Sequence, residues 1–395
     1  MSLWVDKHRP NSLAKLSLHG EVTQKLSSLA GSEELPHLLF YGPPGAGKLT
    51  VFTFQAKLKI PSIQFSLISF TLHSLILFHS ISPLEGKKTR VMALLREIFG
   101  SGVEKVKLEH RTFKPNPSKT IELATLGSNY HIECNPSDVG NNDRLVIQEV
   151  IKEIASHSAL HGQAVNSNNK NFKVVVLNEV DKLSKQAQAG LRRTMESYSA
   201  QCRLILICNS PSKVIEPVRS RTLAIRIPAP SVEDVAQTII DVALKENTSC
   251  PKELAMNIAN MSDRNLRRAL LMLEAAKVQQ TPLAANQTVL LPDWELYIQR
   301  VAREVLQEQS PSKLIHVREM LYELLGNCIP PEVIMETLTR ELMKSLDDSI
   351  RHEVVYWAAF YEHRIRTGSK DIFHLEAFVA KFMAIYKKWL VAFFA

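Results

Sequence analysis

The residues with the clearest chemical role form a glycine-rich turn near the N-terminus. The segment Gly42-Pro43-Pro44-Gly45-Ala46-Gly47-Lys48 matches the phosphate-binding loop pattern, in which a second glycine and a lysine close the loop. Backbone N–H groups of such a loop surround a β-phosphate, and the lysine contacts the β- and γ-oxygens. The apolar run Leu38–Tyr41 before it predicts a buried strand. We therefore expect a nucleotide site; the alternative is a Gly/Pro turn after a core strand.

The groups that would hold Mg²⁺ are replaced or displaced. A Ser or Thr normally follows the loop lysine as a Mg²⁺ ligand, but Leu49 stands there and Thr50 comes one place late. A second apolar strand, Lys173–Leu177, would normally end in Asp-Glu, with the Asp on the metal and the Glu beside the attacking water. Here Asn178 replaces the Asp, while Glu179 keeps the position of the base. This pattern predicts a site that binds nucleotide but hydrolyses it slowly and holds Mg²⁺ poorly.

The residues after Lys48 interrupt the expected strand–loop–helix order. A phosphate loop leads directly into a helix whose N-terminus faces the phosphates, but residues 60–84 contain no Asp, Glu, Lys or Arg and no clean helical period. Removing residues 49–87 joins Lys48 to Lys88. The joined sequence then predicts the missing helix, because apolar residues recur at helical spacing: Val91, Leu94, Leu95 and Ile98.

Three interpretations of residues 49–87 remain open. We favour a translated intron or an equivalent non-native insert, because its excision restores a helix in frame. A membrane span is the second, since about 20 apolar residues suffice; Pro61, Pro83 and the many serines argue against it. A genuine exposed loop is the third, although so apolar a loop would be prone to aggregation.

Composition indicates a soluble intracellular protein. A chain of 395 residues accommodates two or three domains. The formal charge of +8 favours a polyanionic partner weakly, since basic proteins without nucleic-acid ligands are common. The five cysteines include no Cys-x-x-Cys pair, so neither a zinc ribbon nor a disulfide framework is indicated and no metal-ligating set is predicted. The N-terminal residues lack the apolar core of a signal peptide.

Three regions differ in pattern. Residues 1–227 alternate strands and helices, which predicts a parallel α/β sheet with further strands at Arg203–Cys208 and Leu223–Ile227. The polar stretch Ser156–Asn171 is expected to be a loop. Residues 228–280 suit a small helical unit that opens with a capping box at Ser231.

The C-terminal region has a helical pattern throughout. After a linker at 280–292, residues 293–395 carry wide apolar stripes, which usually mean core but also suit a subunit interface. One stripe comprises Phe373, Leu375, Phe378, Phe382 and Ile385. Breaks are expected at Ser310-Pro311, Pro330-Pro331 and Gly368.

Several runs together resemble one known family. The N-terminal Trp4-Val-Asp-Lys-His-Arg-Pro10 is similar to the Trp-Val-x-Lys-Tyr-Arg-Pro box of replication factor C small subunits. Further runs look like the same family: Asn178–Leu183, Leu191–Glu196, Cys208–Ser210 and Arg219–Thr222. The likeness covers nearly the whole chain except residues 49–87 and the last few residues.

The resemblance implies a fold and a function. The fold would be an AAA+ ATPase module at 1–227, a helical lid at 228–280 and an all-α collar at 293–395. The function would be that of a nuclear sliding-clamp loader subunit, which binds ATP and primer–template DNA and loads the clamp in DNA replication and repair. The implied partners are other replication factor C subunits in a hetero-pentamer, the clamp and the DNA, and no membrane is implied. Alternatives are another AAA+ remodelling or helicase subunit, or a product inactivated by residues 49–87.

Individual residues of this chain match positions that form the nucleotide site in the family. Val5 and Pro10 match positions that line the adenine, while His8 departs from the usual Tyr. Asn209 matches the polar sensor after the third strand, and Arg267 matches the lid arginine that senses the γ-phosphate. The alternatives are a turn Asn and a surface arginine.

Other family roles concern neighbouring molecules. Arg221 matches the arginine finger that reaches the ATP of an adjacent subunit, and the alternative is an ordinary surface ion pair. In the family, helices starting near Asn142 and Lys185 line the inner surface of the ring and follow DNA phosphates. They carry the candidate DNA contacts Arg144, Lys152, Arg192 and Arg193, each of which has a solvated surface charge as its alternative.

Overall fold

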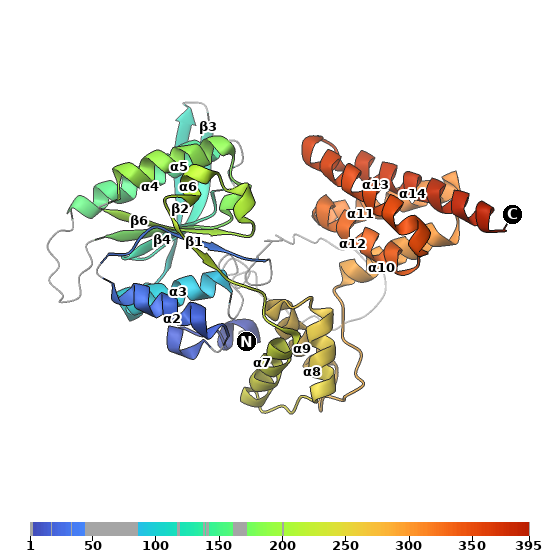
Figure 1. Cartoon of the computed structure of the whole chain (residues 1–395), viewed down its shortest axis with the longest axis horizontal. Coiled ribbons are helices and arrows are strands. Elements are labelled where there is room, and N and C mark those ends of the chain that lie inside the picture. Colours follow the sequence, from blue (N-terminus) through green and yellow to red (C-terminus); the bar gives the residue numbers. More distant parts are fainter. Residues whose placement is uncertain are drawn as a thin grey trace. The chain divides into compact units, whose positions relative to one another are not determined.

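The computed structural model describes residues 3–16, 18–32, 34–43, 86–116, 119–136, 139, 142–160, 172–199 and 201–394. These residues form two compact units (Figure 1). The first extends to Val289 and contains a sheet with its covering helices and a small helical bundle. The second begins at Leu290 and is helical.

A mixed sheet forms the centre of the first unit, with the strand order β2-β3-β4-β5-β6-β1-β7. Its strands are β1 (Leu38–Tyr41), β2 (Lys107–Asn116), β3 (Lys119–Gly127), β4 (His131–Cys134), β5 (Lys173–Leu177), β6 (Cys202–Cys208) and β7 (Leu223–Arg226). The strands from β4 to β7 in this order are parallel, whereas β3 runs antiparallel to both β2 and β4. The predicted α/β class is confirmed, but the β2–β3 hairpin was not anticipated.

Alternate residues of the central strands enter two separate cores. Leu39 of β1 and Val175 of β5 join one apolar cluster, while Leu38 and Val174 join the other. Because successive side chains of a strand point to opposite faces, an all-apolar strand requires cover on both sides. The cover consists of helices, as expected for a doubly wound sheet.

Two helix pairs supply this cover (Figure 1). Helices α2 (Gly20–Gly31) and α3 (Lys87–Phe99) lie on one face, and α4 (Asp143–Leu160) and α5 (Lys185–Ser197) lie on the other. Helix α3 is the helix predicted from apolar spacing, and its four apolar residues are fully buried or nearly so. It ends at Phe99 and is followed by Gly100, whose φ of 80° suits glycine. Helix α4 runs further than expected, because residues 156–160, assigned to a loop, continue the helix.

Three helices form the small bundle of the first unit: α7 (Val232–Lys245), α8 (Lys252–Met261) and α9 (Leu266–Gln279). The predicted capping box is present, since the Ser231 hydroxyl accepts from Asp234 N and the Asp234 carboxylate accepts from Ser231 N, each at 3.0 Å. These reciprocal bonds satisfy N–H groups that the first turn leaves unpaired.

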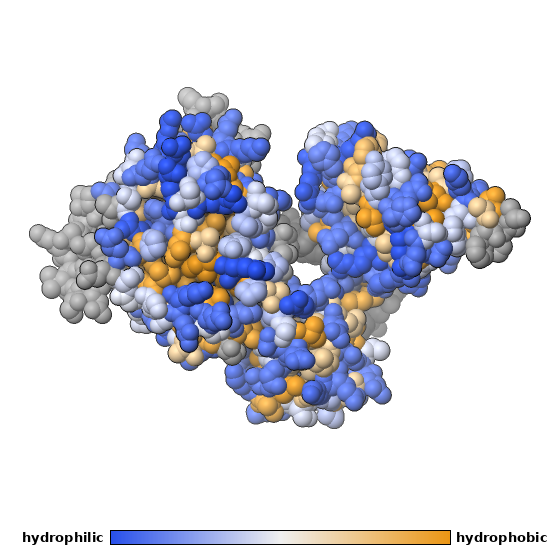
Figure 2. Space-filling view, viewed as in Figure 1, coloured by the Kyte–Doolittle hydropathy of each residue, from blue (hydrophilic) through white to orange (hydrophobic). Residues whose placement is uncertain are grey.

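The second unit contains helices α10 to α14, which share one apolar core. They are α10 (Asp293–Gln307), α11 (Pro311–Gly326), α12 (Pro331–Lys344), α13 (Asp348–Thr367) and α14 (Asp371–Phe394). The expected breaks fall between helices, and proline opens α11 and α12 because its missing N–H costs nothing there. Four residues of the predicted stripe are buried in this core, and the fifth, Phe373, is 59% exposed. The face seen in Figure 2 is mostly hydrophilic, with hydrophobic patches on both units.

Candidate nucleotide site and basic groove

Three neighbouring strands end at one edge of the sheet. In the parallel register Tyr41 at the end of β1 pairs with Cys208 at the end of β6, and β5 lies on the other side of β6. The residues that follow these strands, Gly42, Asn209 and Asn178, therefore emerge at the same carboxyl edge. Ligands of open parallel sheets bind outside this edge.

Gly42 allows the chain to leave β1 against the end of β7. A Cβ at this position would lie 2.0 Å from the carbonyl O of Ile227. The backbone is held there because Ile227 N donates to Tyr41 O at 2.8 Å. Only glycine permits this close backbone approach.

Lys87 places an ammonium group at this edge. It is the first residue of α3 and is 1% exposed. Its Nζ donates to the carbonyl O of Gly42 at 2.7 Å, to that of Pro43 at 3.3 Å and to Asn209 Oδ1 at 3.0 Å. A lysine at a helix N-terminus beside the glycine turn is the arrangement that binds nucleotide phosphates. Asn209 and Gly42, both predicted site residues, are thus brought together by a lysine that was not predicted.

Much of the predicted loop lies outside the described residues: Pro44, Gly45, Ala46, Gly47, Lys48 and Thr50. Their roles remain predictions. Lys87 was not predicted because Lys48 already completes the phosphate-loop pattern after the first glycine turn. A signal was present, since Gly86-Lys87 repeats the Gly47-Lys48 dipeptide directly before the helix.

A buried glutamine fixes the loops that follow β5 and β6. Gln188 of α5 is 1% exposed, and its Nε2 donates to the carbonyl O atoms of Val180, Leu183 and Lys213 at 3.1–3.3 Å. Its Oε1 accepts from Ile215 N at 2.9 Å. Buried polar groups satisfied in this way hold adjacent loops in one arrangement.

Glu179, the predicted base, directly follows Asn178 at the end of β5. Its backbone is left-handed, with φ 52° and ψ 43°, which is strained for a residue with a side chain. Its carboxylate pairs with Lys182 Nζ at 2.5 Å. Among the described residues, no group of three or more His, Cys, Asp or Glu is arranged to hold a metal ion.

A carboxylate at the end of β4 completes this edge. Asn178 Nδ2 donates to Glu133 Oε1 at 2.6 Å. The same oxygen forms an ion pair with the Nζ of Lys88, the second residue of α3. Both ion-pair partners are largely shielded from water, with side-chain exposures of 14% for Lys88 and 7% for Glu133.

The N-terminal box attaches to the three-helix bundle. Val5 is buried within α1 (Trp4–Lys7), and Trp4 N donates to Glu274 Oε2 of α9 at 3.4 Å. His8 Nε2 lies 2.5 Å from Glu246 Oε1, at the end of α7. The histidine that replaces the family tyrosine therefore contacts the bundle.

Charged groups of the box and bundle influence one another. Burial lowers the pKa of Arg267, in the first turn of α9, while nearby Asp6 raises it. Burial likewise lowers the pKa of Arg9, while Glu133 raises it. Pro10 follows Arg9 and is half-buried. These interactions connect the box with both Arg267 and the carboxylate at the end of β4.

Arg221 lies beyond the end of α6 (Glu216–Arg219), and its guanidinium donates to side-chain and backbone acceptors. Its Nε donates to Glu196 Oε1 at 2.8 Å, and its Nη1 donates to Pro217 O at 2.9 Å. The hydrogen bond from Arg221 lowers the pKa of Glu196. The same carboxylate lies 3.6 Å from Arg192 Nε. Glu196 therefore connects the predicted finger with one of the predicted DNA contacts.

A groove of about 520 Å³ lies between α4, α5 and the segment before α6. Three of the predicted DNA contacts line it: Arg144, Arg192 and Arg193. Lys152, also on α4, is exposed but is not among its lining residues. The groove thus brings three of the four predicted DNA residues together.

The start of α4 is joined to the start of α5. The buried carboxylate of Asp143 accepts from Ser184 N at 2.8 Å and from Ser184 Oγ at 3.0 Å. Ser184 in turn caps α5 by accepting from Ala187 N at 3.1 Å. This junction sets the spacing of the two helices and hence of the groove arginines.

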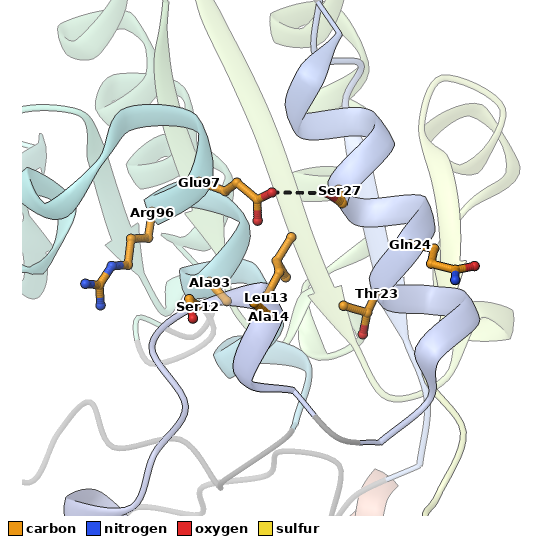
Figure 3. A pocket seen from close by; sticks show the side chains of 9 residues that line it. All are labelled: Ser12, Leu13, Ala14, Thr23, Gln24, Ser27, Ala93, Arg96 and Glu97. Atoms are coloured by element: carbon orange, nitrogen blue, oxygen red, sulfur yellow. Dashed lines mark hydrogen bonds between the residues drawn. The ribbon is translucent and has the colours of Figure 1, made fainter.

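A second cavity, of about 430 Å³, lies between α2, α3 and the 3₁₀ turn Leu13–Lys15 (Figure 3). Ser27 donates to Glu97 across it at 3.1 Å. The cavity contains none of the predicted site residues, so it is separate from the nucleotide edge.

Known protein families match three parts of the chain. Residues 294–390 match "Replication factor C subunit 3, C-terminal domain", and 237–278 match "RCF1/5-like, AAA+ ATPase lid domain". Residues 138–231 match "DNA polymerase III, delta subunit". These matches cover the second unit, the bundle and part of the sheet region.

Curated relatives match nearly the full length. The chain is 48% identical to replication factor C subunit 3 of Bos taurus over 390 residues, covering 99% of this chain and 98% of the relative. It is 48% identical to replication factor C subunit 5 of Oryza sativa over 395 residues, covering 99% of each. It is 46% identical to a probable replication factor C subunit 3 of Dictyostelium discoideum over 388 residues, covering 98% and 99%. Among the described helices, none is long and apolar enough to cross a membrane.

Proposed function

The chain belongs to the replication factor C subunit family, and from this we propose that it is a nucleotide-binding subunit of a sliding-clamp loader. The observation that carries the proposal is the buried Lys87 ammonium at the start of α3, bonded to Gly42, Pro43 and Asn209. An AAA+ lid match and a replication factor C C-terminal match on the same chain support it.

We propose that the chain acts within a hetero-oligomer of replication factor C subunits, on primer–template DNA and the clamp, in the nucleus. Exposed aromatic side chains of the second unit suit a subunit interface, since Tyr356 is 64% exposed and Phe373 is 59% exposed. The arginine-lined groove between α4 and α5 suits the phosphates of DNA.

Two lysines are candidates for the phosphate contact. Lys48 follows the first glycine turn in sequence, whereas Lys87 starts α3 and contacts Gly42 and Asn209. We assign the contact to Lys87, because its side chain already lies at the carboxyl edge of the sheet, where a phosphate oxygen would replace one of its three protein acceptors. Val5, Pro10 and Arg267 remain the proposed residues of the adenine and γ-phosphate sides.

Binding of a fluorescent ATP analogue to the full chain tests this assignment. Lys87→Ala should weaken binding about tenfold to a hundredfold, since a hydrogen bond to a charged group contributes about 1.5–3 kcal/mol. Lys48→Ala and the distant control Lys344→Ala should bind like the parent chain. A large loss of affinity for Lys48→Ala alone would return the role to Lys48, and no binding by the parent chain would contradict nucleotide binding altogether.

Turnover at this site should be slow. Glu179 stands in the base position, but its carboxylate pairs with Lys182, and Asn178 lacks the charge of an Asp. Steady-state hydrolysis by the isolated chain should lie far below the typical enzyme value of about 10 s⁻¹. A rate near that value would refute this part of the proposal.

A further inference from the structure

The carboxyl edge of the sheet holds a lysine where AAA+ sites hold a metal ligand. Lys88 directly follows Lys87 in sequence. In a phosphate loop, the residue after the lysine is the Ser or Thr that binds Mg²⁺. Asn178 ends β5 at the position of the metal-binding Asp. Both side chains converge on one carboxylate oxygen, Glu133 Oε1.

These groups do not fit Mg²⁺. The ion requires near-ideal octahedral oxygen coordination and is commonly held by one or two carboxylates together with phosphate oxygens and water. A protonated lysine has three donors and no acceptor, so Lys88 is unable to ligate a cation and repels one instead. The carboxylate of Glu133 already accepts from both Lys88 and Asn178.

The same groups do fit an anion. Lys87 and Lys88 are consecutive in the first turn of α3, where the helix dipole also favours negative charge. An ammonium has three N–H donors, so Lys88 is able to hold Glu133 and still donate to a phosphate oxygen. Because the charge of Lys88 is already paired with Glu133, its contribution at phosphate would be a fixed hydrogen-bond donor beside the Lys87 ammonium, with no ion recruited from solution.

We propose that the Lys88 ammonium takes the place of Mg²⁺, so that this chain binds ATP and ADP without a divalent cation. The inference rests on the proposed nucleotide site and specifies its chemistry. Glu133 and Asn178 act as positioning residues, since their shared contact fixes Lys88 at the edge.

Equilibrium binding of fluorescent ADP and ATP analogues to the full chain tests the proposal. Dissociation constants are measured in Mg²⁺ and in EDTA. Values that agree within about threefold support the inference, and a loss of affinity of more than about tenfold in EDTA overturns it. Binding only in Mg²⁺ would overturn this inference and leave the nucleotide site intact, whereas no binding in either buffer would overturn both.

Two variants isolate the role of Lys88. Lys88→Thr combined with Asn178→Asp restores the usual hydroxyl and carboxylate, and binding should then become at least about tenfold tighter in Mg²⁺ than in EDTA. Lys88→Gln should weaken binding in EDTA by about tenfold, while the matched charge removal Lys344→Gln should not. Circular dichroism confirms that each variant is folded. If the double variant does not fold, Lys88→Gln decides: unchanged affinity in EDTA would show that Lys88 does not contact the nucleotide.

Discussion

Gly42 tolerates no side chain, because a Cβ would lie 2.0 Å from a backbone carbonyl of Ile227 that is itself bonded into the sheet. We expect Gly42→Ala to lower the free energy of unfolding by about 1–3 kcal/mol, the usual cost of forcing atoms into a filled site. Thermal or urea unfolding of the full chain measures this change. Gly31→Ala is the matched control, since nothing lies within 4 Å of its added Cβ. Equal effects of the two substitutions would refute the steric account.

Arg221 and Glu196 form a pair whose separate roles are measurable. As a finger, Arg221 would stabilise transition-state charge on the nucleotide of a neighbouring subunit, and such fingers contribute about 10³–10⁵ in rate elsewhere. We expect Arg221→Ala to lower ATPase activity of the assembled ring by at least about tenfold and to leave nucleotide binding by this chain unchanged. Glu196→Gln should cause a smaller decrease, because it releases the guanidinium without removing it. Unchanged ATPase activity in the Arg221→Ala ring would exclude the finger role.

The groove between α4 and α5 is lined by arginines from two helices, and the contact between Asp143 and Ser184 joins the starts of these helices. Phosphate contacts contribute to affinity without reading sequence. Arg144→Ala with Arg193→Ala should therefore weaken ring binding to any primer–template alike. The slope of log affinity against log salt should fall by roughly 0.7–0.9 for each arginine–phosphate interaction that the substitutions remove.

Lys152→Ala is the informative comparison for this groove, since Lys152 lies on α4 outside the lining residues. Its removal should change the salt slope less than removal of either groove arginine. An unaltered slope in the double arginine variant would mean that the groove does not contact DNA.

The central strands were predictable because burial on both faces requires a continuous apolar run, and α3 was predictable because burial on one face leaves a helical period in the sequence. The β2–β3 hairpin was missed because its strands, such as Lys107–Asn116, mix polar and apolar residues. The continuation of α4 to Leu160 was missed because Ser and His residues there resemble a loop. Phe373 was assigned to the core by spacing alone, which does not show where a stripe meets solvent.

In the candidate site too, some features were predictable from the sequence and others were not. The phosphate-loop motif predicted Gly42, the usual Asp-Glu strand end predicted Glu179, and the family resemblance predicted Asn209; the strand register places the residues after β1, β5 and β6 at one edge. The dipeptide Gly86-Lys87 was visible in the sequence, but the contacts of Lys87 with Gly42 and of Lys88 with Glu133 were not, because the partners come from segments far apart in sequence. The pairing of parallel strands shows which residues share an edge of the sheet. Only the hydrogen bonds and ion pairs show which of these residues contact one another.

The boundary between the two units at Leu290 predicts that the second unit folds independently of the first. The buried residues of its apolar core all lie between Ile298 and Ile385, and all five of its helices contribute to them. A fragment 290–395 should show helical circular dichroism and a cooperative urea transition, with a stability in the usual range of about 5–15 kcal/mol. A broad, non-cooperative transition would show that this unit requires the rest of the chain.

The start of α3 at Gly86-Lys87 also changes what an excision of the intervening residues would mean. Removing residues 49–87 leaves Gly47-Lys48 joined to Lys88, while removing 48–86 leaves Gly47 joined to Lys87-Lys88, and the two products have the same sequence. The protein sequence of a shortened chain would therefore not distinguish between these two sets of boundaries. In a shortened chain, Lys48 and Lys87 would be two numbers for one residue, and the motif and the helix start would identify the same phosphate contact.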